Sequence, residues 1–333
     1  MNRNYIVSFL AVLVLYLIAY VGVSAMGLQV LFGVVIPYIA FIVFIAGFIY
    51  RIIDWAKTPV PFSIPSTCGQ QKSMPWIKQS KFENPSTPFG VVVRMALEIF
   101  CFRSLFRNTK ARVVEGGTKL SFEMEKWLWL GAIAFHYCFL VALIRHLRFF
   151  VEPVPFWVQL VEKLDGFIQI GLPGIMLSGI LLLAAVIYLF LRRIFISQVR
   201  YISLASDFFP LFLIMGIAIS GIVMRYFTKV DVTAAKALAM GLVTFRPAIP
   251  DGISGIFFVH LFLVCILMAY FPFSKLMHLG GIFFSPTRNQ IANTREYRHV
   301  NPWNYPVKVH TYQEYEDEFR DKMIEAGLPV EKE

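Results

Sequence analysis

Six stretches of about twenty mainly apolar residues run through the chain, and they constrain its fold more than any other feature. A helix of that length crosses the hydrocarbon core of a bilayer, which is about 30 Å thick. The stretches cover roughly residues 5–25, 29–53, 126–149, 168–191, 207–227 and 254–278. Because the runs are continuous and do not alternate in ten-residue segments, they exclude a transmembrane β-barrel. The sequence therefore predicts an all-α integral membrane protein, a bundle of six transmembrane helices.

The composition agrees with a membrane protein. Hydrophobic residues make up 57% of the chain and charged residues only 16%, whereas soluble domains are about 25% charged. The first apolar stretch follows Arg3 and ends in "VGVSA", which is similar to a signal-peptidase site. Its apolar run is long for the core of a signal peptide, so we interpret it as a retained helix.

Basic residues are distributed unevenly among the loops, and this predicts an orientation. The net charge of +10 needs no nucleic acid to explain it, because multispanning proteins carry excess Lys and Arg on their cytoplasmic side. Lys and Arg concentrate in residues 54–125, 192–200 and 285–333. We therefore expect a multi-pass protein of the cytoplasmic (inner) membrane, with these segments and both termini in the cytoplasm. The short loop near residue 26 and the loops at 150–167 and 228–253 then lie outside.

The chain divides into four parts. Residues 1–53 are expected to form two N-terminal transmembrane helices, 54–125 a cytoplasmic loop, 126–284 a four-helix core, and 285–333 a cytoplasmic C-terminal tail. Six prolines exclude regular helix from the first half of the loop. Residues 89–106 have a helical pattern, and we place this helix in the membrane surface. The charged tail fits equally a solvated segment and a docking surface for a cytoplasmic partner.

Four histidines lie in two of the predicted spans, where polar groups are costly. His136 and His146 are in the third span, and His260 and His278 are in the sixth. At about 1.5 Å per residue, the first two are about 15 Å apart along their helix and the second two about 27 Å. The third helix runs outward and the sixth inward. His146 therefore meets His260 near the outer surface, and His136 meets His278 near the inner surface.

Each of these two levels offers two imidazoles from facing helices, which is the ligand set of a six-coordinate haem iron. We expect two stacked b-type haems, one in each leaflet. Arg145, Arg148 and Arg225 stand near outer helix ends, against the charge rule, and are candidate partners of the outer haem propionates. Snorkelling to lipid phosphates is the competing explanation for these arginines. A single histidine in a span most often forms only an interhelical hydrogen bond.

Other cofactors are disfavoured by the residues that the spans lack. Zinc, manganese and di-iron sites use carboxylates beside the histidines, and a proton relay needs acidic partners. The histidine-bearing spans have no Asp or Glu in their interiors. The four cysteines form no CxxC or CxxCH motif, so they indicate neither an iron–sulfur cluster nor covalent haem.

The histidine spacings, with "LRRIFISQVR" after the fourth span and "LMAYFPFSKLMH" closing the sixth, resemble the gamma subunit, a cytochrome b, of respiratory nitrate reductase. This resemblance covers residues 126–285. The fuller chain, with "PVPFSIPSTCGQQKSMPWIK" and "EIFCFRSLFRNTKARV" in the long loop, resembles the membrane cytochrome b subunit family (DsrM) of the sulfite-reduction-associated electron transport complex. An additional first helix and the loop at 54–125 distinguish the chain from the nitrate reductase subunit.

The resemblance implies that His146 and His260 ligate the outer haem and His136 and His278 the inner haem. It also implies that menaquinone reacts beside the outer haem near a lysine, for which Lys163 is the match; the alternative role of Lys163 is an interfacial anchor. The implied partners are a cytoplasmic iron–sulfur subunit resembling heterodisulfide reductase, a periplasmic multihaem cytochrome c, a periplasmic iron–sulfur protein and a second quinone-interacting membrane subunit.

These features together predict a dihaem cytochrome b. It transfers electrons between the menaquinone pool and a cytoplasmic iron–sulfur partner in sulfur or sulfite respiration, as a subunit of an oxidoreductase complex and not as a stand-alone enzyme. The alternative is a non-redox membrane anchor or scaffold, whose histidines only form hydrogen bonds between helices and which is colourless. A transporter is disfavoured because the spans lack paired acidic residues.

Overall fold

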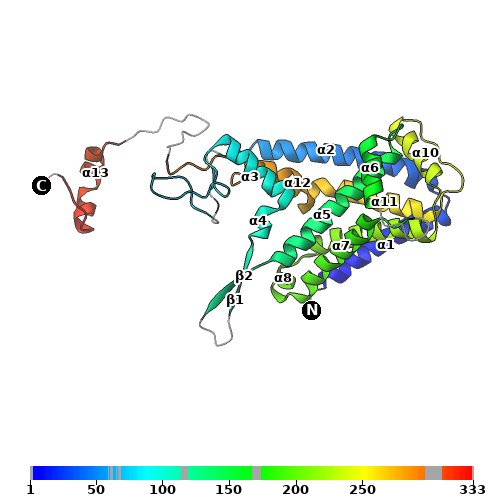
Figure 1. Cartoon of the computed structure of the whole chain (residues 1–333), viewed down its shortest axis with the longest axis horizontal. Coiled ribbons are helices and arrows are strands. Elements are labelled where there is room, and N and C mark those ends of the chain that lie inside the picture. The colour runs from blue at the N-terminus through cyan, green and yellow to red at the C-terminus, as the bar shows by residue number, and fades with distance from the viewer. Residues whose placement is uncertain are drawn as a thin grey trace.

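A computed structural model describes residues 3–58, 60, 63–64, 66, 69–113, 119–166, 174–296 and 310–331. Its six longest apolar helices are α1 (Asn4–Ser24), α2 (Ile36–Ala56), α5 (Lys126–His146), α7 (Leu177–Phe195), α9 (Ala205–Ile222) and α11 (Gly255–Tyr270) (Figure 1). Short π or 3-10 turns start the second span at Leu31 and extend the third, fifth and sixth to Phe149, Phe227 and Phe273. In the part of the chain that the structure describes, six helices are thus long and apolar enough to cross a membrane. The prediction of six spans is confirmed.

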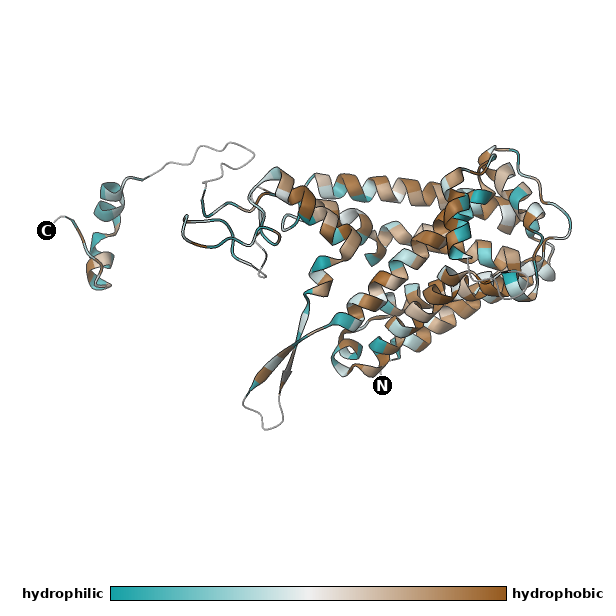
Figure 2. Ribbon diagram, in the orientation of Figure 1, coloured by the Kyte–Doolittle hydropathy of each residue, from teal (hydrophilic) through white to brown (hydrophobic). Residues whose placement is uncertain are grey.

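Apolar side chains cover these helices on their outer as well as their inner faces. Hydrophilic residues gather on the C-terminal helix and at the ends of the bundle (Figure 2). Ile42 on α2 is 65% exposed and Leu17 on α1 is 47% exposed. Monomeric soluble proteins rarely expose apolar surface on this scale, so these outer faces are suited to lipid.

The larger core lies between α1, α2, α9 and α11. Val12, Phe32, Leu213 and Leu263 contribute to it, one from each of the first, second, fifth and sixth spans. A second, smaller cluster around Val186 and Ile214 joins α7 to α9 and α5. The two N-terminal spans therefore pack into one bundle with the later four, and α5 lies beside α7 at the edge of this bundle.

The loops divide between two ends of the bundle (Figure 1). One end, the α3 end, carries α3 (Pro88–Cys101), α4 (Arg103–Phe106), the strands β1 (Thr109–Val113) and β2 (Leu120–Met124), α8 (Ser197–Ile202) and α12 (His278–Gly281). The other, the α6 end, carries α6 (Phe156–Asp165) and α10 (Val232–Val243). The basic loops expected on one side of the membrane thus lie together at the α3 end. That the α3 end faces the cytoplasm stays a prediction.

The segment at 89–106 is not the single helix that its pattern predicts. It forms α3 and α4, separated by Phe102 in a left-handed conformation with φ of 49° and ψ of 46°. The structure also has an antiparallel hairpin, in which Thr109 pairs with Met124 and Val113 with Leu120. The all-α prediction therefore holds for the bundle but misses this two-stranded element.

The sixth span ends earlier than predicted. The predicted helix at 254–278 stops at Phe273, and Ser274 is extended, with ψ of 176°. Pro272 lacks the N–H needed to continue a helix, and the Ser274 hydroxyl caps the next turn by accepting from the Leu276 N–H at 3.2 Å. His278 therefore stands in α12, beyond this break. The fourth span starts at Leu177, and residues 167–173, which the prediction included, lie outside the described residues.

At the α3 end, the long loop packs against residues after the sixth span. The Ile64 N–H donates to Pro286 O at 3.3 Å, and the Ala292 N–H donates to Pro85 O at 2.7 Å. The beginning of the predicted tail is thus part of the folded α3 end. Further along, α13 (Tyr312–Glu325) is a helix whose first turn is capped by Thr311.

Candidate functional site

Two histidine pairs connect α5 with α11 and α12. The ring centres of His146 and His260 are 6.3 Å apart, and their planes differ by 14°. The ring centres of His136 and His278 are 5.8 Å apart, and their planes differ by 84°. The structure therefore brings the four histidines together in the two combinations expected from the directions of the helices. Their ligation of iron stays a prediction.

Three of the four imidazoles are oriented by the backbone. His136 Nδ1 lies 2.7 Å from Ala132 O, His146 Nδ1 lies 2.6 Å from Ala142 O, and His278 Nδ1 lies 3.0 Å from Lys275 O. A carbonyl oxygen only accepts hydrogen bonds, so Nδ1 carries the proton and donates it. The Nε2 atom then keeps its lone pair, which is the form in which a neutral imidazole binds a metal.

A serine on α9 orients the fourth imidazole. His260 Nδ1 lies 2.9 Å from Ser220 Oγ, and this hydroxyl lies 2.8 Å from Gly216 O. Because the single hydroxyl proton of Ser220 is donated to the carbonyl, Oγ accepts from the Nδ1–H of His260. All four histidines are therefore held through Nδ1, with Nε2 left for a ligand.

The spacing within each pair fits a haem iron. Two metal–imidazole bonds of about 2 Å each, with about 1 Å from each ring nitrogen to its ring centre, place the two ring centres about 6 Å apart. The helices leave room as well, since α5 packs closely against α7 but not against α11. In the most apolar 18-residue stretch of the third span, only 6% of the residues are buried, against 22–33% in the corresponding stretches of the other five spans.

A bare metal ion fits these residues less well. Within the described ranges, no group of three or more His, Cys, Asp or Glu side chains gathers to hold a metal ion. Structural and catalytic zinc sites need three or four protein ligands. Each histidine pair offers two, which is the number needed as axial ligands of a haem iron.

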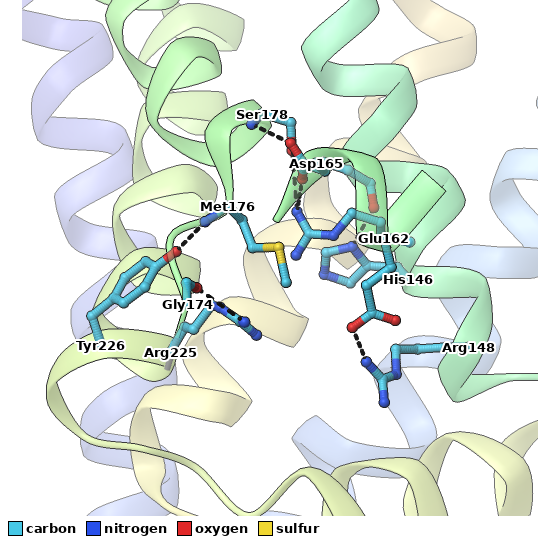
Figure 3. A network of polar contacts seen from close by, with 11 residues as sticks. His146, Arg148, Glu162, Asp165, Gly174, Met176, Ser178, Arg225 and Tyr226 are labelled. Atoms are coloured by element: carbon cyan, nitrogen blue, oxygen red, sulfur yellow. Dashed lines mark hydrogen bonds and ion pairs between the residues drawn. The ribbon is translucent and has the colours of Figure 1, made fainter. Parts of the chain in front are cut away.

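The arginine candidates for the outer propionates are already engaged in protein contacts (Figure 3). Arg145 Nη1 lies 2.5 Å from Asp165 Oδ2 and 3.1 Å from Ser178 Oγ. Arg148 forms an ion pair with Glu162. Arg225 lies over the ring of Tyr226 and donates to Gly174 O at 3.3 Å. Figure 3 shows Arg148 and Arg225 in the region of His146, and propionate binding stays a prediction for all three arginines.

A cavity of about 710 Å³ opens between α6 and the segment around Met176, in the region of His146 that Figure 3 shows. Its lining includes Arg148, Glu162, Lys163, Met176 and Arg225. The structure thus places Lys163 in one cavity with two of the three propionate candidates. A volume of this size is typical of a site for a small organic molecule.

Asp165 and Ser220 are the site residues that sequence reasoning missed. The Asp165 carboxylate is buried and also accepts from the Ser178 N–H and hydroxyl, both at 2.7 Å. Sequence alone offered one signal for Asp165: it is an acidic residue in the predicted loop at 150–167, which directly follows Arg145 and Arg148. Ser220 gave no signal, because an isolated serine in an apolar span is common.

The fold and these pairs define a class: a multi-pass, mainly helical membrane protein in which two histidine pairs connect α5 with α11 and α12. The chain belongs to the nitrate reductase gamma subunit family, whose model matches residues 86–299 and so includes all four histidines. It is 49% identical over 282 residues to the Hdr-like menaquinol oxidoreductase cytochrome b-like subunit of Archaeoglobus fulgidus, over 83% of this chain and 84% of the relative. It is 43% identical over 276 residues to the protein of the same name from Archaeoglobus profundus, over 81% of each.

Proposed function

We propose that the chain is the dihaem cytochrome b subunit of a quinone-linked membrane oxidoreductase complex. It transfers electrons between menaquinol at the α6 end and a cytoplasmic iron–sulfur partner at the α3 end. The observation that carries this proposal is the pair of ring-centre separations, 5.8 and 6.3 Å, between histidines of α5 and of α11 and α12. The names of the two relatives, which include menaquinol oxidoreductase and cytochrome b-like, support it.

The histidines have defined roles in this proposal. His146 and His260 hold the outer haem, and His136 and His278 hold the inner haem. Bound haem supplies one-electron transfer across the bilayer. The Nδ1–H bonds to backbone and Ser220 oxygens fix each ring, so that Nε2 is presented without reorganisation.

The cavity between α6 and the segment around Met176 is the proposed menaquinol site. Lys163 donates to a quinone oxygen, and Arg148 and Arg225 form the cationic side of the cavity toward the outer propionates. Arg145, which forms an ion pair with Asp165, is the third propionate candidate. Oxidation of a quinol releases two electrons and two protons, and the protons leave on the outer side. An electron that moves inward does work of about 2.3 kcal/mol per 100 mV of membrane potential.

The α3 end is the proposed docking side for the partners in the cytoplasm. The "Hdr-like" name of the relatives supports an iron–sulfur subunit resembling heterodisulfide reductase. The periplasmic multihaem cytochrome c and the periplasmic iron–sulfur protein belong to the α6 side of the complex, and the second quinone-interacting subunit lies in the membrane. We also propose a role in sulfur or sulfite respiration and membership of the DsrM family, on the resemblance carried by the loop at 54–125.

Haem retention in single-histidine variants tests this function. His146→Ala and His260→Ala should each lose one haem, and the lost haem should be the same in both. His136→Ala and His278→Ala should each lose the other haem. His310→Ala, which changes an exposed histidine before α13, is the matched control and should keep both. A colourless wild-type chain contradicts the proposal and favours the non-redox scaffold. Haem loss that does not follow these pairs contradicts the proposed ligand assignment.

A further inference from the structure

The break between α3 and α4 has an unusual backbone. Phe102 adopts φ of 49° and ψ of 46°, the left-handed region. This region is sparsely populated by residues other than glycine, and a bulky residue there is an outlier. A glycine would reverse the chain at this point without strain. The chain has a phenylalanine here instead, and the left-handed conformation fixes where its aromatic ring lies.

The ring of Phe102 lies against an inner histidine. Its centroid is 4.9 Å from that of His136, and the two planes are perpendicular. The same ring of His136 contacts Phe135 in the same manner on its own helix and faces His278. Phe102 is thus the phenylalanine neighbour of His136 that comes from the α3 end, whereas Phe135 comes from α5 itself.

Side chains of α5 hold the segment that ends α3, which we call the elbow, residues 100–102. The indole Nε1–H of Trp129 donates to Cys101 O at 2.8 Å, and the Tyr137 hydroxyl donates to Phe100 O at 2.8 Å. The last carbonyls of a helix have no partner within the helix. Here α5 supplies the donors, so the end of α3 is fixed directly to the helix that carries His136.

Buried charges hold the elbow from the other side. Glu98, which is buried near the end of α3, accepts from the Ser104 N–H at 3.1 Å and from the Ser104 hydroxyl. The Arg103 Nε–H donates to Glu83 at 3.0 Å, and Glu83 is 2% exposed. A strained residue persists only where its surroundings determine it, and these contacts on both flanks meet that requirement.

We infer that the elbow is a positioning element for His136, with Phe102 as the residue that acts on the imidazole. The inference rests on the proposed function, because His136 is there an axial ligand of the inner haem. Phe102 limits rotation of the His136 ring, whose only described hydrogen bond is the one from Nδ1 to Ala132 O. The elbow therefore couples the folded α3 end to the electronic properties of the inner haem and leaves the outer haem unaffected.

The test uses the full chain and compares Phe102→Gly and Phe102→Leu with wild type. Phe102→Gly removes the ring and relieves the backbone, whereas Phe102→Leu keeps apolar volume without an aromatic ring. Phe89→Leu is the matched control, because Phe89 lies on the same helix, α3, and its side chain is 77% exposed. The first two readouts are the low-spin EPR g values and the midpoint potential of each haem, and the His278→Ala and His260→Ala variants assign these signals to the two haems. The third readout is the thermal midpoint of unfolding.

Both Phe102 variants should shift the g values and potential of the inner haem only, and Phe89→Leu should shift neither haem. The thermal midpoint of Phe102→Gly should be equal to or above that of Phe102→Leu. Tyr137→Phe, which removes one donor to the elbow without touching His136, should shift the same signal in the same direction and by less. Unchanged inner-haem signals in both Phe102 variants, or equal shifts of both haems, overturn the inference.

A second readout separates this inference from the proposed function. If the wild-type chain binds no haem, the proposed function fails, and the rate at which diethylpyrocarbonate modifies His136 then decides the inference. The positioning role predicts several-fold faster modification of His136 in Phe102→Gly than in wild type, with an unchanged rate at His310. Equal rates at His136 overturn it.

Discussion

Replacement of Asp165 by alanine tests whether the buried ion pair beside the outer histidines stabilises the bundle. The Asp165 side chain is 5% exposed and that of Arg145 is 15% exposed. Asp165 accepts from Arg145 Nη1 at 2.5 Å and from two donors of Ser178 at 2.7 Å. The variant leaves a buried cation and a buried N–H without their acceptor. We expect the free energy of unfolding to fall by about 3–5 kcal/mol.

The assay is unfolding by SDS in mixed micelles, followed by tryptophan fluorescence. Glu162→Ala is the control, because it breaks the neighbouring pair with Arg148, whose side chains are 25% and 37% exposed. Pairs that exposed contribute about 0–1 kcal/mol. The double replacement of Arg145 and Asp165 by leucine should recover most of the loss, because it removes both buried charges. A loss in Asp165→Ala no larger than that in Glu162→Ala refutes the reasoning.

Three further predictions concern other polar groups. Glu83→Gln removes the buried charge that pairs with Arg103, so it should lower the free energy of unfolding by about 3 kcal/mol. Amide hydrogen exchange in α3 should then be faster, and an unchanged exchange rate contradicts the prediction. Ser220→Ala removes the acceptor of the His260 Nδ1–H and should weaken outer-haem binding by about tenfold or more. Transfer of haem to apomyoglobin measures this affinity, and an unchanged affinity shows that Ser220 does not orient His260. Lys163→Ala should raise KM for a menaquinol analogue by about tenfold with an unchanged optical spectrum, and an unchanged KM excludes Lys163 from the site.

The spans could be predicted because the bilayer dictates their length and polarity. Each crossing needs about twenty apolar residues, so the six helices follow from hydropathy alone. The helix ends were harder, as the sixth span shows: His278 was expected on one continuous helix with His260, but Pro272 and Ser274 end that helix first. His278 still meets His136, because both lie at the same end of the bundle.

The elbow and the hairpin were missed for different reasons. Phe102 carries no signal of a helix end, since a left-handed phenylalanine depends on contacts with α5 and with buried charges distant in sequence. The hairpin did have a signal. Its strands alternate apolar and polar residues, "TKARV" and "LSFEM", and Gly116 and Gly117 stand between them in the sequence, a pattern typical of hairpins.

The pairing of the histidines was predictable from sequence, because the distribution of Lys and Arg among the loops predicts the direction of each helix. Opposite directions of the third and sixth spans place His146 with His260, and the structure has them side by side. The pairing of Arg145 with Asp165 was only partly predictable. An acidic residue near these arginines was a signal, but Asp165 ends α6, and no local pattern determines how α6 packs against α5. Buried ion pairs of this kind become visible only when tertiary packing is known.

The haem-to-protein ratio of the purified chain, with its reduced-minus-oxidised spectrum, tests the central proposal most directly. The account predicts two haems per chain, a b-type α-band, and rapid reduction of that band by a menaquinol analogue. A colourless chain contradicts it. A wild-type chain with one haem, when both His146→Ala and His278→Ala retain that same haem, also contradicts it.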